Sequence, residues 1–135
     1  MNVHSYLRAY MAGILLPTWF LVLVLAAFLV ANATQSVPAR VERVLIFPMA
    51  VVPNLWGLWN LLYTALELRG RVSIGVFGAV LPLLLVPAGL GLAFALDLDF
   101  YRTAHAAVVM PLAMGLYYLV WKYGVAFLNR VVGLG

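Results

Sequence analysis

Residues 80–96 read VLPLLLVPAGLGLAFAL, a segment with no charged, amide or hydroxyl side chain at any position. A second run of this kind, LVLVLAAFLV, occupies residues 21–30. A strand of a membrane barrel alternates lipid-facing and lumen-facing residues, and neither run alternates. Uninterrupted apolar sequence of this length instead predicts α-helices, which satisfy their backbone hydrogen bonds internally within a lipid bilayer.

The composition of the whole chain places it in the same class. Of its 135 residues, 67% are hydrophobic and 9% are charged, and the mean hydropathy is +1.09. Soluble domains are about half apolar and a quarter charged, so a soluble fold of this size could not bury so much apolar surface. We therefore expect an all-α integral membrane protein in which residues 1–135 form a single membrane domain.

The spacing of the charged residues predicts how many times the chain crosses the membrane. They leave four uncharged stretches, and a hydrocarbon core about 30 Å thick needs roughly 20 helical residues. The first stretch is too long for the apolar region of a signal peptide, so we expect it in the mature protein. Short connections favour an antiparallel bundle. The predicted transmembrane helices are 11–32, 44–66, 74–96 and 105–128.

The distribution of basic residues predicts the orientation. With the N-terminus inside, five Lys and Arg residues flank the inner helix ends and three flank the outer ones, and an excess of basic residues marks the cytoplasmic side. We therefore predict a multi-pass protein of the cell (inner) membrane, with both termini in the cytoplasm. The net charge of +4 fits contact with anionic lipid head groups, so membrane lipids are the expected partners and nucleic acid is not. The five inner residues are Arg8, Arg69, Arg71, Lys122 and Arg130, and the outer ones are Arg40, Arg43 and Arg102.

The second predicted helix carries an unusual stripe of aromatic and amide side chains. Trp56, Asn60 and Tyr63 recur at steps of three and four, so they share one helix face. An asparagine amide finds no partner in hydrocarbon, so this face should turn toward other helices or a cavity. One hypothesis is a midplane site for an uncharged lipophilic or aromatic molecule, and the alternative is helix packing alone. The candidate ligand-binding residues are Asn54, Trp56, Trp59, Asn60 and Tyr63.

Other aromatic residues are interpreted as an interfacial belt. Tyr117, Tyr118, Trp121 and Tyr123 gather at the end of the fourth predicted helix. The amphipathic rings of Tyr and Trp favour the head-group level of a membrane, which explains residues near helix ends. This explanation does not extend to Trp56 and Trp59, which lie near the middle of the second predicted helix.

The third predicted helix is rich in small residues, including the pairs Gly89/Ala93 and Gly91/Ala95 with three residues between the members. Such patterns allow two helix backbones to approach closely. We therefore expect this helix to make close contacts, either inside the bundle or with a second copy or a partner subunit.

The connection before the fourth helix contains Asp97, Asp99 and His105, which are predicted to lie at the outer edge. Two carboxylates and an imidazole can bind a divalent metal, although such residues more often cap helix ends. The chain has no cysteine and no motif that commits it to a reaction, so no cofactor is predicted and a protein without catalytic activity is favoured.

Three functions follow in order of preference. The first is binding or transport of an uncharged lipophilic or aromatic molecule through the site on the second helix. The second is a non-catalytic membrane scaffold or accessory subunit, and the third is a lipid-active enzyme that uses the outer edge.

Overall fold

The computed structural model describes residues 3–35, 40–66, 68, 70–95 and 103–134, and it describes their side chains outside 35–49, 92–93 and 103–107. Nearly all of these residues belong to helices. The helices are α1 (Val3–Gln35), α2 (Arg40–Ala65), α3 (Ile74–Val80), α4 (Pro82–Ala95), α5 (Thr103–Leu119), the π-helix η1 (Val120–Val125) and α6 (Ala126–Val131).

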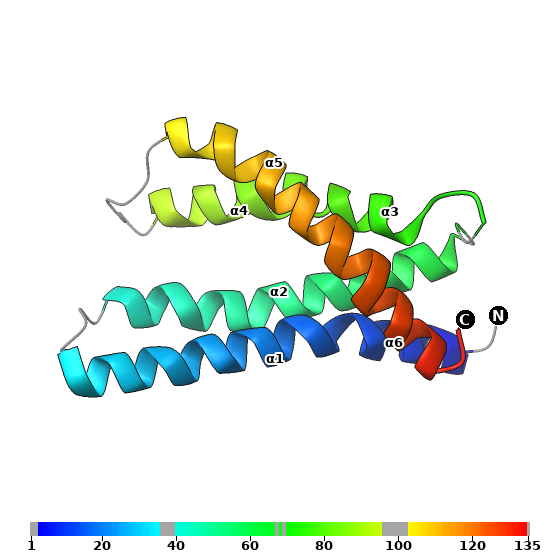
Figure 1. Cartoon of the computed structure of the whole chain (residues 1–135), viewed down its shortest axis with the longest axis horizontal. Helices are drawn as coiled ribbons and strands as arrows, with labels where there is room; N and C mark the ends of the chain where they lie inside the picture. Colours follow the sequence, from blue (N-terminus) through cyan, green and yellow to red (C-terminus); the bar gives the residue numbers. More distant parts are fainter. Residues whose placement is uncertain (1–2, 36–39, 67, 69, 96–102, 135) are drawn as a thin grey trace.

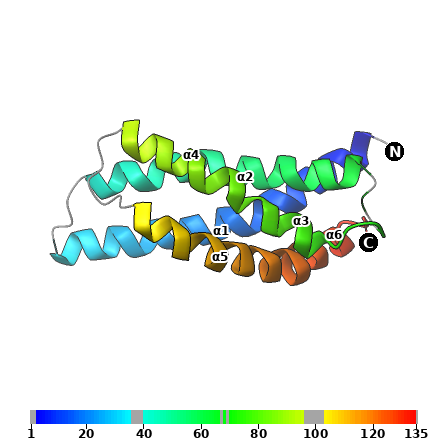
Figure 2. The same ribbon diagram turned by 90° about the horizontal axis from the view of Figure 1, so that it is seen from above.

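The helices form two antiparallel pairs that meet at one end of the molecule (Figure 1). One pair is α1 with α2, and the other is α3 and α4 with α5. Figure 2 shows that α5, η1 and α6 follow one another as a single curved rod. This rod crosses from the second pair to the first, so α6 reaches the beginning of α1. Both termini and the turn between α2 and α3 lie at this end, which we call the terminal end, and the helix pairs separate toward the other, distal end.

The prediction of a helical chain suited to a membrane is confirmed. Three helical stretches of the described chain, Val3–Thr34, Ile74–Gly91 and Val108–Val131, are long and apolar enough to cross a bilayer. Only 11% of the most apolar window of the first and last stretches is buried inside the protein. Most of their apolar side chains therefore point outward, as expected for helices surrounded by lipid.

The predicted third helix differs from the observed one because it is interrupted. It divides into α3 and α4 at Leu81, immediately before Pro82. Proline has no backbone N–H and cannot continue the α-helical ladder. The carbonyl oxygen of Gly78 instead accepts a bond from the N–H of Leu81, at 3.1 Å. The apolar sequence predicted a membrane-spanning segment here but not its division into two helices.

The last helix contains a π-helical segment that was not predicted. In η1, Trp121 and Val125 are buried and face the rest of the protein. A Cβ atom on Gly78 of α3 would lie 2.0 Å from Cγ of Trp121, so only glycine leaves room for this indole. Gly124, within η1, similarly admits the side chain of Leu16 from α1. The contact of Gly124 with Leu16 joins the two helix pairs.

Close packing of α1 against α2 also depends on glycine. A Cβ on Gly13 would lie 2.6 Å from the carbonyl oxygen of Trp56, and one on Gly57 would lie 2.6 Å from a methyl carbon of Ile14. Small residues that bring backbones together are the usual basis of helix association in lipid. The buried core is correspondingly small and consists of Trp56, Leu81, Trp121 and Val125 at the junction of the two pairs.

Candidate functional site

The aromatic and amide stripe of α2 faces the neighbouring helices. Trp56, Asn60 and Tyr63 are exposed by only 6%, 0% and 8%. The predicted orientation of this stripe is therefore confirmed. The contacts of each residue show whether the stripe packs against other helices.

Asn60 joins three helices through what we call the asparagine clasp, formed by Asn60, Asn129 and the carbonyl of Ala9. The Asn60 amide donates to the Ala9 carbonyl oxygen of α1 and to Oδ1 of Asn129 in α6, both at 2.7 Å. In return, Nδ2 of Asn129 donates to Oδ1 of Asn60 at 3.0 Å. A buried amide without partners is costly, so this mutual pairing fixes α6 against α1 and α2.

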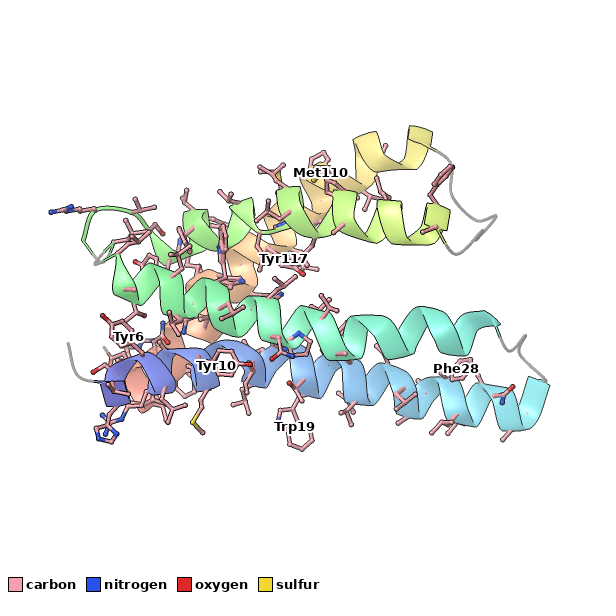
Figure 3. The ribbon with its side chains drawn as sticks, turned by 180° about the vertical axis from the view of Figure 1, so that it is seen from behind. Tyr6, Tyr10, Trp19, Phe28, Met110 and Tyr117 are labelled. Carbon is pink, nitrogen blue, oxygen red and sulfur yellow. The ribbon has the colours of Figure 1, made fainter. Side chains whose placement is uncertain are left out.

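Trp56 belongs to a second group, the aromatic junction, which comprises Trp56, Tyr117 and Trp121. The Trp56 ring meets the ring of Tyr117 edge-on, with centroids 5.0 Å apart, and the centroid of the Trp121 ring is 5.4 Å away. Its indole nitrogen donates to the Tyr117 hydroxyl at 3.3 Å. Figure 3 shows Tyr117 between the two helix pairs. Aromatic contacts of this kind stabilise packing beyond the area they bury.

The indole N–H of Trp121 is the exception within the aromatic junction. Its nitrogen is buried and has no hydrogen-bond partner among the described residues. A buried donor without an acceptor costs about 1–3 kcal/mol. The ring of Trp121 therefore stabilises the core through its volume and contacts, whereas its unpaired indole N–H lowers the stability of the fold.

Trp59 and Tyr63 contact the beginning of the next helix rather than the junction. The Trp59 ring stacks on Phe77 of α3 at 4.8 Å between centroids, and its indole nitrogen donates to the Phe77 carbonyl oxygen at 2.9 Å. The Tyr63 hydroxyl donates to the carbonyl oxygen of Val72 at 2.8 Å. These bonds hold the turn and α3 against the end of α2.

Asn54 is exposed and contacts α1. Its side-chain nitrogen donates to the Ala50 carbonyl oxygen at 2.6 Å, and its oxygen accepts a bond from the Tyr10 hydroxyl of α1. The five predicted ligand-binding residues are thus distributed over separate contacts: Asn60 in the clasp, Trp56 in the junction, Trp59 and Tyr63 against α3 and the turn before it, and Asn54 against Tyr10 of α1. Their role in binding a ligand stays a prediction.

The predicted outer-edge residues Asp97, Asp99 and His105 lie outside the described side chains. Among the residues that the structure describes, no group of three or more His, Asp or Glu residues could hold a metal ion. The hypothesis of a lipid-active enzyme depends on this edge and also stays a prediction.

Three residues of these groups were not predicted, namely Tyr117, Trp121 and Asn129. The belt interpretation is wrong for Trp121, which is 0% exposed, because this ring fills the core instead of reaching the head groups. These three residues and Val125 are spaced four apart, at positions 117, 121, 125 and 129, and they form a stripe on the last helix. The spacing test applied to the second helix would have found this stripe.

Glycines on the distal half of the second helix pair have no close neighbours. A Cβ on Gly89 or Gly91 of α4, or on Gly115 of α5, would meet no atom of the described residues within 4 Å. By contrast, Gly75 and Gly78 of α3 contact Tyr118 and Trp121 respectively. The small residues predicted for the third helix therefore make internal contacts at Gly75 and Gly78 of α3, whereas Gly89 and Gly91 of α4 have no described neighbour within 4 Å of an added Cβ.

No family model, curated protein or solved structure matches this chain. Function is therefore inferred from the contacts of the chain itself. The described polar groups of the α2 stripe bond to neighbouring helices or to the turn before α3, whereas Gly89 and Gly91 of α4 have no described neighbour within 4 Å of an added Cβ.

Proposed function

We propose that this chain is a non-catalytic membrane subunit with four transmembrane helices and both termini in the cytoplasm, which assembles with other transmembrane helices through α4. The two helix pairs support the four crossings, since α2 has 26 residues and packs along α1. The shared position of the two termini agrees with an even number of crossings (Figure 1).

The observation that carries this proposal is a face of α4 made of Leu84, Ala88, Gly91 and Ala95, which we call the α4 face. These residues are separated by four, three and four positions, so they lie on one side of the helix. All four are exposed. A close partner helix would cover them and contact the Gly91 backbone, which is how small residues act in membrane helix pairs.

Energetics also favour a partner at this face. A glycine within a helix is roughly 1 kcal/mol less favourable than alanine. Gly13, Gly57 and Gly78 offset this cost by admitting another helix or a tryptophan. Gly91 has no such contact among the described residues, and an approaching helix would supply it.

The test uses Gly91→Leu, with Gly115→Leu as the matched control. At both positions an added Cβ meets no atom of the described residues within 4 Å, so we expect both variants to keep the fold. Energy transfer between labelled copies in vesicles reports self-association, and purification from native membranes reports a different subunit. We expect Gly91→Leu to abolish one of these associations and Gly115→Leu to preserve it. Association that survives Gly91→Leu would refute the proposal.

A second candidate function, binding of an uncharged lipophilic or aromatic molecule, is favoured by the buried Trp121 N–H. An oxygen acceptor on a guest molecule would satisfy this donor once the aromatic junction opened to admit it. The test is a thermal-shift screen of uncharged lipophiles that bear a carbonyl group. Any stabilisation of the wild-type protein should be lost in Trp121→Phe, and a screen without stabilisation would remove this candidate.

A further inference from the structure

Lys122 is a cation on the last helix whose described neighbours are aromatic. Its Nζ atom lies 5.3 Å from the centre of the Tyr118 ring and 5.5 Å from that of Tyr123. A Lys ammonium over an aromatic face is attracted to the ring, so the two rings hold the side chain in a limited set of positions. The residue itself is exposed, and one side of the ammonium is therefore open to a ligand.

The position of Lys122 is closer to the membrane surface than its place in the sequence suggests. It lies well inside the apolar stretch Val108–Val131. However, a Cβ on Gly75, the second residue of α3, would lie 3.0 Å from Cβ of Lys122. Since α3 begins at Ile74 and exposed Arg71 precedes it, Lys122 is level with a helix end. The last helix crosses obliquely (Figure 1). From a position level with a helix end, a long lysine side chain can extend to the head groups.

The π-helix explains how two tyrosines reach one lysine. A π-helix bonds residues five apart, so residues at this spacing lie nearer to one face than they do in an α-helix. Tyr118 and Tyr123 are five apart, and most of the segment between them belongs to η1. In a regular α-helix they would point in different directions. The local geometry that buries Trp121 therefore also aligns both rings beside Lys122.

The charge of the chain is concentrated at the same end. Five of the eight basic residues and one of the four acidic residues flank the terminal helix ends in the sequence, whereas the distal ends have three of each. The whole net charge of +4 therefore belongs to the terminal end. An end with this charge attracts anionic head groups, and Lys122 is the described cation that lies beside two aromatic rings.

We infer that Lys122, Tyr118 and Tyr123 form a binding site for the phosphate of an anionic phospholipid. Lys122 supplies the charge and donor, and the tyrosine hydroxyls can donate further hydrogen bonds. Exposed Leu119 and Phe127, at 52% and 56%, lie on the same helix and offer an apolar surface to the acyl chains. This surface favours a lipid over a free phosphate ion.

The test measures phosphatidylglycerol binding to the detergent-purified protein by native mass spectrometry, with phosphatidylcholine as the neutral reference lipid. Lys122→Gln should weaken phosphatidylglycerol binding by more than about tenfold, because a charge-assisted bond is lost. The matched control is Arg130→Gln, an exposed basic residue at the same end. It should weaken binding by less than about fivefold, the usual contribution of one basic residue near a membrane.

A second variant tests the rings without changing the charge. Tyr118→Leu/Tyr123→Leu should also weaken phosphatidylglycerol binding, since the lysine is no longer held in position, and it carries the test if Lys122→Gln does not fold. Circular dichroism in phosphatidylcholine establishes the folding of each variant. Equal losses in Lys122→Gln and Arg130→Gln, or unchanged binding in the double variant, would overturn the inference. Inorganic phosphate that binds as tightly as the lipid would also overturn it.

Discussion

The terminal and distal ends of this protein use the same residue types in different ways. Toward the terminal end, Gly13 faces the backbone of α2, Gly78 faces Trp121, and buried asparagines bond to each other. At the distal end, Gly89 and Gly91 face no described neighbour. Since lipid provides no hydrophobic force between helices, contact depends on shape and polar pairing. The difference indicates that the terminal end holds the chain together, while the distal end of α4 is available to a partner.

Replacing Gly78 should produce the largest effect on stability. In Gly78→Leu, a Cβ atom would lie 2.0 Å from Cγ of Trp121, so the indole or the whole of α3 must move. We expect a loss of roughly 3 kcal/mol or more, as for strongly overpacked cores. Unfolding by dodecyl sulfate in mixed micelles measures this loss, and a stable Gly78→Leu protein would contradict the packing described for the terminal end.

Breaking the asparagine clasp should have the next largest effect. Asn60→Leu leaves the Asn129 amide and the Ala9 carbonyl without their partner, which should cost about 1–3 kcal/mol. The double variant Asn60→Leu/Asn129→Leu should lose less than the sum of the two single losses, because neither amide is then left unpaired. Additive losses would show that the two asparagines do not act as a pair.

The two tryptophans of the aromatic junction should differ from each other. Trp56→Phe removes a hydrogen bond to Tyr117, whereas Trp121→Phe removes an N–H that has no partner among the described residues. We expect Trp121→Phe to be less destabilising than Trp56→Phe by about 1 kcal/mol. The same mixed-micelle unfolding assay compares them. A larger loss for Trp121→Phe would imply that its N–H is bonded in the membrane.

Replacing Gly91 by alanine should have the smallest effect, and it should be opposite in sign. No described atom lies within 4 Å of the added Cβ, so Gly91→Ala should stabilise the isolated chain by roughly 0.5–1 kcal/mol through helix propensity. Gly13→Ala should instead destabilise it, since its Cβ would lie 2.6 Å from the Trp56 carbonyl oxygen. Destabilisation by both changes would remove the distinction between the two ends.

The sequence by itself determined the class of the protein and the approximate position of each helix. These positions can be predicted because the thickness of the bilayer sets the length of a membrane-spanning helix, and an apolar stretch of that length is recognisable in the sequence. It also determined that the stripe of Trp56, Asn60 and Tyr63 turns away from lipid, because its spacing matches one helix face.

Only the tertiary structure decided which polar and small residues meet. Asn54 and Asn60 are the same residue type six positions apart on one helix, yet one is exposed and the other pairs with a residue 69 positions away. Gly78 and Gly91 likewise look alike in the sequence, but only Gly78 faces a tryptophan. Such pairings depend on which faces of separate helices meet, and the hydropathy of a stretch does not specify the rotation of a helix about its axis.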